Sequence, residues 1–105
     1  AGDVNGDGFD DLIIGADSAN PNGSSSGQSY VVFGHSGGFS ASFNLSTLNG
    51  TNGFVLNGIN AGDNSGRSVS SAGDVNGDGF DDILIGAPLA DPNGSSSGQS
   101  YVIFG

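Results

Sequence analysis

The stretch AGDVNGDGFDDLIIGA occupies residues 1–16, and it returns almost unchanged as AGDVNGDGFDDILIGA at residues 72–87. The copies extend further, because residues 72–105 repeat residues 1–34 with only six differences. The repeat period is therefore 71 residues, and residues 35–71 are the single copy of the intervening stretch. Self-similarity at a fixed period is typical of solenoids and propellers, in which neighbouring repeats bury a shared core.

The pattern of apolar residues within one period predicts β-strands. Short apolar, β-branched or aromatic runs, bounded by Gly, Asn, Pro and Ser, occur at residues 11–16, 28–33, 53–56, 67–72, 82–87 and 99–104. No segment has apolar residues at helical spacing, so we expect essentially no helix. Four short strands per period are typical of a propeller blade. The sequence therefore predicts an all-β fold of four-stranded antiparallel blades, with about one and a half repeats present.

The composition excludes several classes of function. The chain has 105 residues, 21 of them glycine, and 11 aspartates face a single cation, Arg67, for a net charge of −10. Without a basic surface, nucleic-acid binding is excluded, and no apolar run reaches the ~20 residues that a membrane span needs. The chain has no cysteine and no glutamate, and its one histidine, His35, lies in a Gly/Ser-rich segment. We therefore expect no enzyme, no nucleic-acid partner and no membrane insertion.

The most specific chemistry lies in the repeated segment at residues 3–11. Side-chain oxygens alternate at Asp3, Asn5 and Asp7, the carbonyl of Phe9 can add a main-chain oxygen, and Asp11 closes the set. The second copy offers the corresponding oxygens of Asp74, Asn76, Asp78, Phe80 and Asp82. Carboxylate-rich oxygen ligation suits Ca²⁺, whereas Mg²⁺ demands stricter octahedral geometry and zinc prefers nitrogen or sulfur. The sequence thus predicts two calcium sites.

The repeated segment has two other interpretations. Asn-Gly and Asp-Gly are turn formers, so the segment could be a plain polar hairpin turn. Four aspartates within nine residues argue against that, because they repel one another without a cation. A helix-flanked calcium loop would need an acidic residue at position twelve, where this chain has Ile14 and Ile85.

The segment at residues 65–88, which joins SGRSVSSAGDVNGDGFDD to ILIGAP, resembles an FG-GAP repeat, the calcium-binding propeller repeat of integrin alpha chains and many bacterial surface proteins. Gly86-Ala87-Pro88 matches the GAP element, while Ser65-Gly66 replaces Phe-Gly. The resemblance implies that residues 67–72 form the innermost strand of a blade. Residues 82–87, 99–104 and 53–56 would follow outward, with the metal loops on one face of the disc.

This order divides the chain into three parts. Residues 1–34 are a partial repeat with the calcium loop and the second and third strands. Residues 35–71 hold a connecting loop, an outermost strand and the innermost strand of the next blade, and residues 72–105 repeat the first part. Because neither blade is complete, we expect further copies of the repeat as partners, in a longer chain, a homo-oligomer or a filament.

Three functions fit these features. The favoured one is a non-catalytic, calcium-binding structural, adhesion or protein-interaction module of an extracellular or cell-surface protein. The first alternative is a self-assembling subunit or segment of a surface filament. The second is a glycan-binding accessory domain of a secreted enzyme, which would use the Pro-Asn-Gly-Ser-Ser-Ser-Gly segments at residues 21–27 and 92–98.

Overall fold

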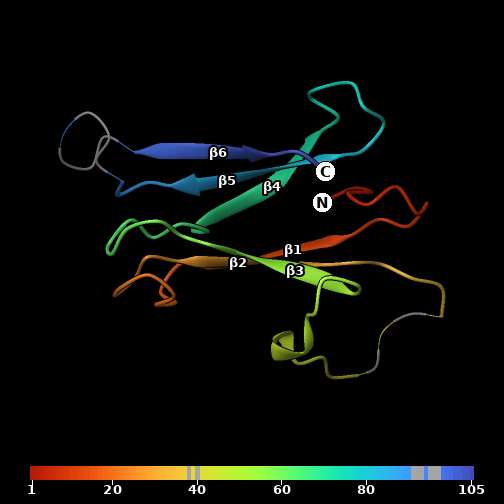
Figure 1. Cartoon of the computed structure of the whole chain (residues 1–105), viewed down its shortest axis with the longest axis horizontal. Coiled ribbons are helices and arrows are strands. Elements are labelled where there is room, and N and C mark those ends of the chain that lie inside the picture. Colours follow the sequence, from red (N-terminus) through yellow and green to blue (C-terminus); the bar gives the residue numbers. More distant parts are fainter. Residues whose placement is uncertain (38, 40, 91–93, 95–97) are drawn as a thin grey trace.

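The computed structural model describes residues 1–37, 39, 41–90, 94 and 98–105. Two antiparallel three-stranded sheets make up the fold (Figure 1). The first sheet contains β1 (Leu12–Ala16), β2 (Gln28–Val32) and β3 (Gly53–Asn57), and the second contains β4 (Ser68–Gly73), β5 (Asp82–Ala87) and β6 (Gln99–Ile103). A single 3₁₀ turn, η1 (Leu45–Thr47), lies between β2 and β3, and the described residues form no α-helix. The all-β prediction is confirmed.

The strand order is the one expected from the repeat. Neighbours in the first sheet follow the order β1-β2-β3 and those in the second β4-β5-β6. Each predicted strand boundary lies within one residue of the observed one. Asp11 falls just outside β1, because it pairs only with Gly2 in an isolated bridge. This order agrees with the predicted one, in which β1, β2 and β3 would be the second, third and outermost strands of one blade, and β4, β5 and β6 the innermost three of the next.

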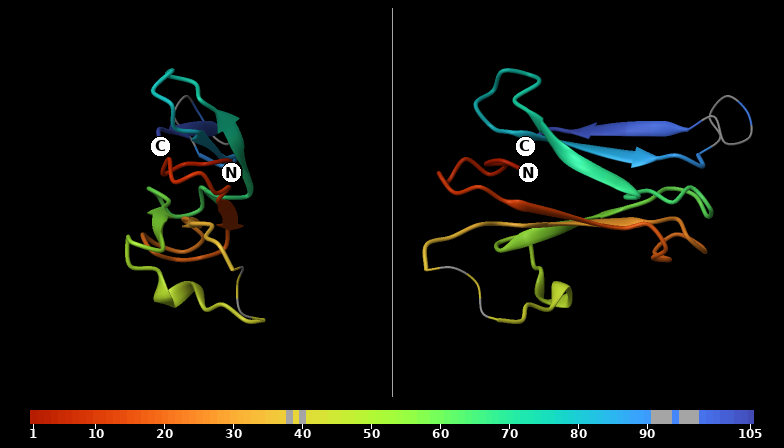
Figure 2. Two further views of the ribbon diagram at one scale, coloured as in Figure 1. Left: turned by 90° about the vertical axis from the view of Figure 1, so that its right-hand side faces the viewer. Right: turned by 180° about the vertical axis from the view of Figure 1, so that it is seen from behind.

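The two sheets pack face to face, and the protein's core lies between them. Its four buried members are Val4 and Val31 from the first repeat, and Ile83 and Ile85 from the second. Figure 2 shows the second sheet above the first, with the segment at residues 41–52 on the far side of the first sheet. The core is thus an interface between two copies of one repeat.

Strand register decides which side chains enter this interface. In the first sheet Ile13 pairs with Val31, and both point toward the second sheet. In the second sheet Ile85 lies between Val69 and Tyr101, and this row points toward the first. Since side chains alternate along a strand, every second residue of each sheet faces away from the core.

The repeat supplies a matched pair for testing the core. Val31 is completely buried, whereas Val102, its partner in the second repeat, is exposed. We expect Val31→Ala to lower the free energy of unfolding by about 1–3 kcal/mol, because it removes buried methyl groups and leaves a cavity. Val102→Ala should change it by less than about 0.5 kcal/mol. Urea unfolding in dilute solution measures both values, and equal losses would contradict the packing described.

Candidate metal loops

The segment that precedes β1 curls around the carboxylate of Asp3. One oxygen of Asp3 accepts the backbone amides of Gly6 and Asp7 at 2.7 and 3.0 Å, and the other accepts the amide of Gly8 at 2.9 Å. Gly6 and Gly8 have φ of 77° and 89°, which other residues rarely adopt. The side chain of Asn5 reaches Asp7, with Asn5 Nδ2 donating to Asp7 Oδ2 at 3.1 Å. The turn therefore gathers the first three predicted ligands.

The second copy forms the same turn between β4 and β5. Asp74 accepts the amides of Gly77, Asp78 and Gly79 at 2.8, 3.1 and 2.8 Å. These amides, foremost that of Gly79, hold the pKa of the Asp74 carboxyl below its usual value, against an opposing contribution from desolvation. The ionised carboxylate, which is the form that binds a cation, is therefore favoured.

Asp11 and Asp82, the predicted closing ligands, have a different environment from the rest. Both are buried. Asp11 accepts the amide of Val4 at 2.8 Å with one oxygen and that of Gly34 at 2.9 Å with the other. Asp82 accepts the amides of Val75 and Gly105 in the same way, at 2.7 and 2.9 Å. Each buried carboxylate ties the start of its loop to a glycine two positions beyond the end of β2 or β6.

The remaining predicted ligand in each loop is a backbone carbonyl. Phe9 and Phe80 lie in the loops, and their amides donate to the carboxylates of Asp7 and Asp78 at 2.9 and 3.0 Å. Within the described part of the chain, no group of three or more His, Asp or Glu side chains has the arrangement of a metal site. The structure thus brings positions one, three and five together, and it holds the position-nine aspartate through main-chain amides instead.

The chemistry of the donors fits a hard cation. The loops offer carboxylate and amide oxygens on one exposed turn, with the backbone amides already turned toward Asp3 or Asp74. A carboxylate oxygen that accepts one amide still has a free lone pair, so Asp11 and Asp82 also retain acceptor capacity. Calcium ligation by these residues remains a prediction.

One contact between the loops was not anticipated from the sequence. The carboxylate of Asp81 accepts the amide of Asp3 at 3.0 Å, and the amide of Asp81 donates to the Asp3 carbonyl at 3.0 Å. Both loops therefore lie at one end of the molecule, as Figure 1 shows. Nothing in the sequence distinguishes Asp81 from Asp10, its partner in the first repeat, so no local signal could have revealed this role.

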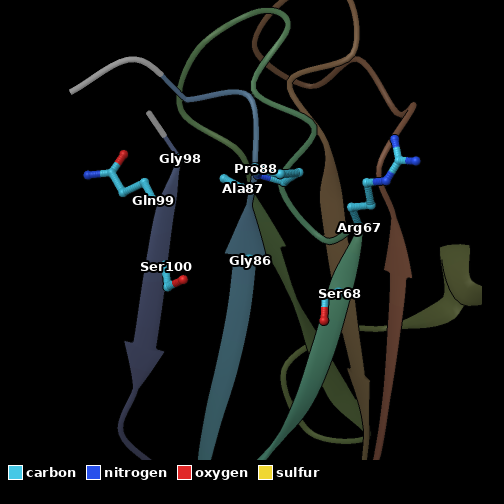
Figure 3. Close-up of a pocket in the computed structure, with 8 residues that line it drawn as sticks. All are labelled: Arg67, Ser68, Gly86, Ala87, Pro88, Gly98, Gln99 and Ser100. Carbon is cyan, nitrogen blue, oxygen red and sulfur yellow. The ribbon is translucent and has the colours of Figure 1, made fainter. Parts of the chain in front are cut away.

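The opposite end of β4 carries a hollow of about 700 Å³ beside Arg67. Figure 3 shows Ser68, Gly86 and Ser100 along its floor, with Arg67 at one side and Gln99 at the other. Arg67 makes no ion pair with an aspartate among the residues that the structure describes. Residues 92, 93 and 95–97 of the second Pro-Asn-Gly-Ser-Ser-Ser-Gly segment lie outside the described residues, so the predicted glycan-binding loop has no structural description there.

Comparison with known proteins identifies the repeat. The FG-GAP repeat family matches residues 1–32 and 65–103. Integrin alpha-2 of Mus musculus is 38% identical over 85 residues, which cover 81% of this chain and 7% of the integrin. Integrin alpha-PS2 of Drosophila melanogaster is 35% identical over 108 residues, covering 98% of this chain and 7% of the integrin. The chain thus spans only a small fraction of these relatives.

The family match covers five of the six strands and both repeated loops. The chain belongs to the FG-GAP repeat family, and its repeats are of the integrin-alpha type. The resemblance that was drawn from residues 65–88 is therefore confirmed. The family match omits residues 33–64, which contain the connecting segment and β3.

The buried aspartates provide a test of the loop geometry. We expect Asp11→Asn, measured in excess chelator, to lower the free energy of unfolding by about 1–3 kcal/mol. The reason is that the new amide group must point its N–H donors at the N–H of Val4 or of Gly34. Asp10→Asn removes the same charge from the adjacent residue, whose side chain is exposed, and should change the free energy of unfolding by less than about 0.5 kcal/mol. Similar losses in the two variants would contradict a role for Asp11 as a double acceptor.

Proposed function

We propose that this chain is a calcium-binding propeller repeat module that acts as a non-catalytic scaffold in an extracellular or cell-surface protein. The observation that carries the proposal is the repeated loop, in which Asp3 and Asp74 each accept three backbone amides. Both copies of the loop have the same hydrogen bonds, and the chain belongs to the FG-GAP family. These two facts support one common function for the two loops. A cation is the ligand that its exposed oxygens suit.

The ligands follow from the positions of these oxygens. We assign one ion to Asp3, Asn5, Asp7, the Phe9 carbonyl and Asp11, and a second to Asp74, Asn76, Asp78, the Phe80 carbonyl and Asp82. A bound Ca²⁺ would supply positive charge among carboxylates that otherwise repel one another. The residues of the chain hold the turn closed, and the buried Asp11 and Asp82 anchor it to the strands. Each ion would therefore stabilise a loop that bears on the interface between blades.

The scaffold role is supported by the relatives. The similarity to integrin alpha chains supports a role of this repeat in adhesion. None of the described segments forms an apolar helix long enough to cross a bilayer. We propose that the partners are proteins. We propose a location outside the cell or at its surface, because extracellular calcium modules bind the ion with dissociation constants of about 10⁻⁴–10⁻³ M, which suits exposed loops of this kind.

Calorimetric titration of the metal-free protein with Ca²⁺ tests the proposal. We expect two ions per chain, and Asp3→Ala and Asp74→Ala should each remove one of them. At a hundredfold excess over the dissociation constant, each ion should add about 2.7 kcal/mol to the free energy of unfolding, because it binds only the folded state.

The control is Asp17→Asn, which removes one charge far from both loops and should leave two ions bound. A wild-type chain whose melting temperature is the same in Ca²⁺ and in excess chelator would contradict the proposal. Equal loss of binding in Asp17→Asn and Asp3→Ala would also contradict it, since binding would then follow net charge alone.

A further inference from the structure

Two adjacent residues of the second loop, Phe80 and Asp81, lie against the first loop. The Asp81 carboxylate accepts the amide of Asp3 at 3.0 Å, and the Asp81 amide donates to the Asp3 carbonyl at 3.0 Å. Asp81 therefore holds both main-chain polar groups of the residue at which the first loop begins. Because these bonds use the main chain of Asp3, its carboxylate stays with the turn of its own loop.

The packing around these hydrogen bonds is close. A Cβ added at Gly2 would collide with the Asp81 carboxylate, and one added at Gly6 would collide with the ring of Phe80. The second loop thus contacts the first on both sides of Asp3 in the sequence, each time at a glycine. A side chain at either glycine would push the two loops apart.

The closing aspartate of the second loop belongs to the same junction. Asp82 accepts the amide of Gly105 at 2.9 Å. A Cβ added at Gly105 would collide with the main-chain oxygens of Asp81 and of Val4, one from each loop. Gly105 therefore fits between the two loops while its amide is bound by a residue that we assign to the second calcium site.

Phe80 and Asp81 also have a particular position among the proposed ligands. The carbonyl of Phe80 and the carboxylate of Asp82 are assigned to the second site, so Asp81 lies between two of its ligands in the sequence. Asp3 is the first ligand of the other site. The main chain that holds the ligands of one site is therefore in direct contact with the main chain that holds a ligand of the other.

We propose that Asp81 and Phe80 couple the two calcium sites, so that an ion bound in one loop strengthens binding in the other. The reason is conformational, because a site whose ligands are already held in place loses less conformational freedom on binding. Asp81 acts through the main chain of Asp3, so it is a positioning residue of the first site. The coupling rests on the calcium binding proposed above and describes how that binding is regulated.

Repulsion between two bound ions acts in the opposite direction. Water and dissolved salt screen the interaction between exposed charges, and the loops are largely exposed. The hydrogen bonds and the close packing between the loops do not weaken in this way. At physiological ionic strength we therefore expect the ordering of the loops to decide the sign of the coupling.

Calorimetric titration with Ca²⁺ at physiological ionic strength measures this coupling. Asp74→Ala should leave the first site alone and Asp3→Ala the second, and each substitution keeps the main-chain groups of the residue that it changes. In the wild type, the product of the two association constants should exceed the product of the two single-site constants. The expected excess is about fivefold or more, which is the lower end of typical coupling between sites.

Substitutions of Asp81 test its role directly. Asp81→Ala, made in the wild type and in both single-site variants, should abolish the excess because it removes the acceptor of the Asp3 amide. Asp81→Asn is the matched control. It removes the same charge but keeps a side-chain oxygen that accepts this amide, so it should retain the excess.

Phe80→Ala supplies a second test. It removes the ring beside Gly6, keeps the main-chain carbonyl that we assign as a ligand, and should reduce the excess. Phe9→Ala removes the corresponding ring of the first loop and should leave the excess unchanged. A Cβ added at Gly77, the counterpart of Gly6, would meet nothing within 4 Å among the described residues. Far-ultraviolet circular dichroism verifies folding, and Phe80→Ala decides the outcome where Asp81→Ala does not fold.

Three results would overturn the coupling and leave the calcium sites standing. The first is a wild type that binds two ions with no excess, or with a product of constants below that of the single sites. The second is an excess that survives in Asp81→Ala. The third is an equal loss in Asp81→Asn and Asp81→Ala, since the coupling would then follow charge. A wild type that binds no Ca²⁺ would contradict the proposed function and the coupling together.

Discussion

A buried carboxylate that accepts two main-chain amides is the interaction on which the rest of each repeat depends. Asp11 connects the amide of Val4, at the start of the metal loop, to that of Gly34, beyond the third strand of the blade. The side chain of Val4 also lies in the core between the sheets. The same carboxylate therefore fixes the base of the loop, the chain just beyond the central strand β2, and one of the four buried residues between the two sheets.

Much of this architecture could be predicted because the sequence contains the same strand and loop pattern in two copies. The strands follow from short apolar runs between turn residues, and their boundaries shift by no more than one residue in the structure. Gly6 and Gly8 mark the curl of the loop, where a positive φ is required. The alternating oxygens of Asp3, Asn5 and Asp7 do gather on one turn, as their spacing indicates.

The sequence could not predict the environment of each copy. Val31 and Val102 lie in the same local sequence, so no propensity or pattern distinguishes the buried one from the exposed one. The difference arises because the second sheet packs against the side of the first sheet that carries Val31. The side of the second sheet that carries Val102 is exposed. The role of Asp11 was hidden for a similar reason, since ligand spacing reveals that an oxygen is near the loop but not that two amides already bind it. Tertiary contact, rather than local pattern, decides both.

The distribution of charge along β4 has a consequence for how this molecule meets its surroundings. Six aspartates of the two loops lie beyond one end of this strand: Asp7, Asp10, Asp74 and Asp78 are exposed, and Asp3 and Asp81 are half-buried. Arg67 precedes the other end of the strand. The molecule measures 46 Å along its longest axis, several times the Debye length of about 8 Å at physiological ionic strength. Each end therefore presents its own local field, and the chain behaves as an electric dipole. Near a cationic surface, the chain would turn its acidic loop end toward that surface before any contact forms, and dissolved salt would weaken this orientation.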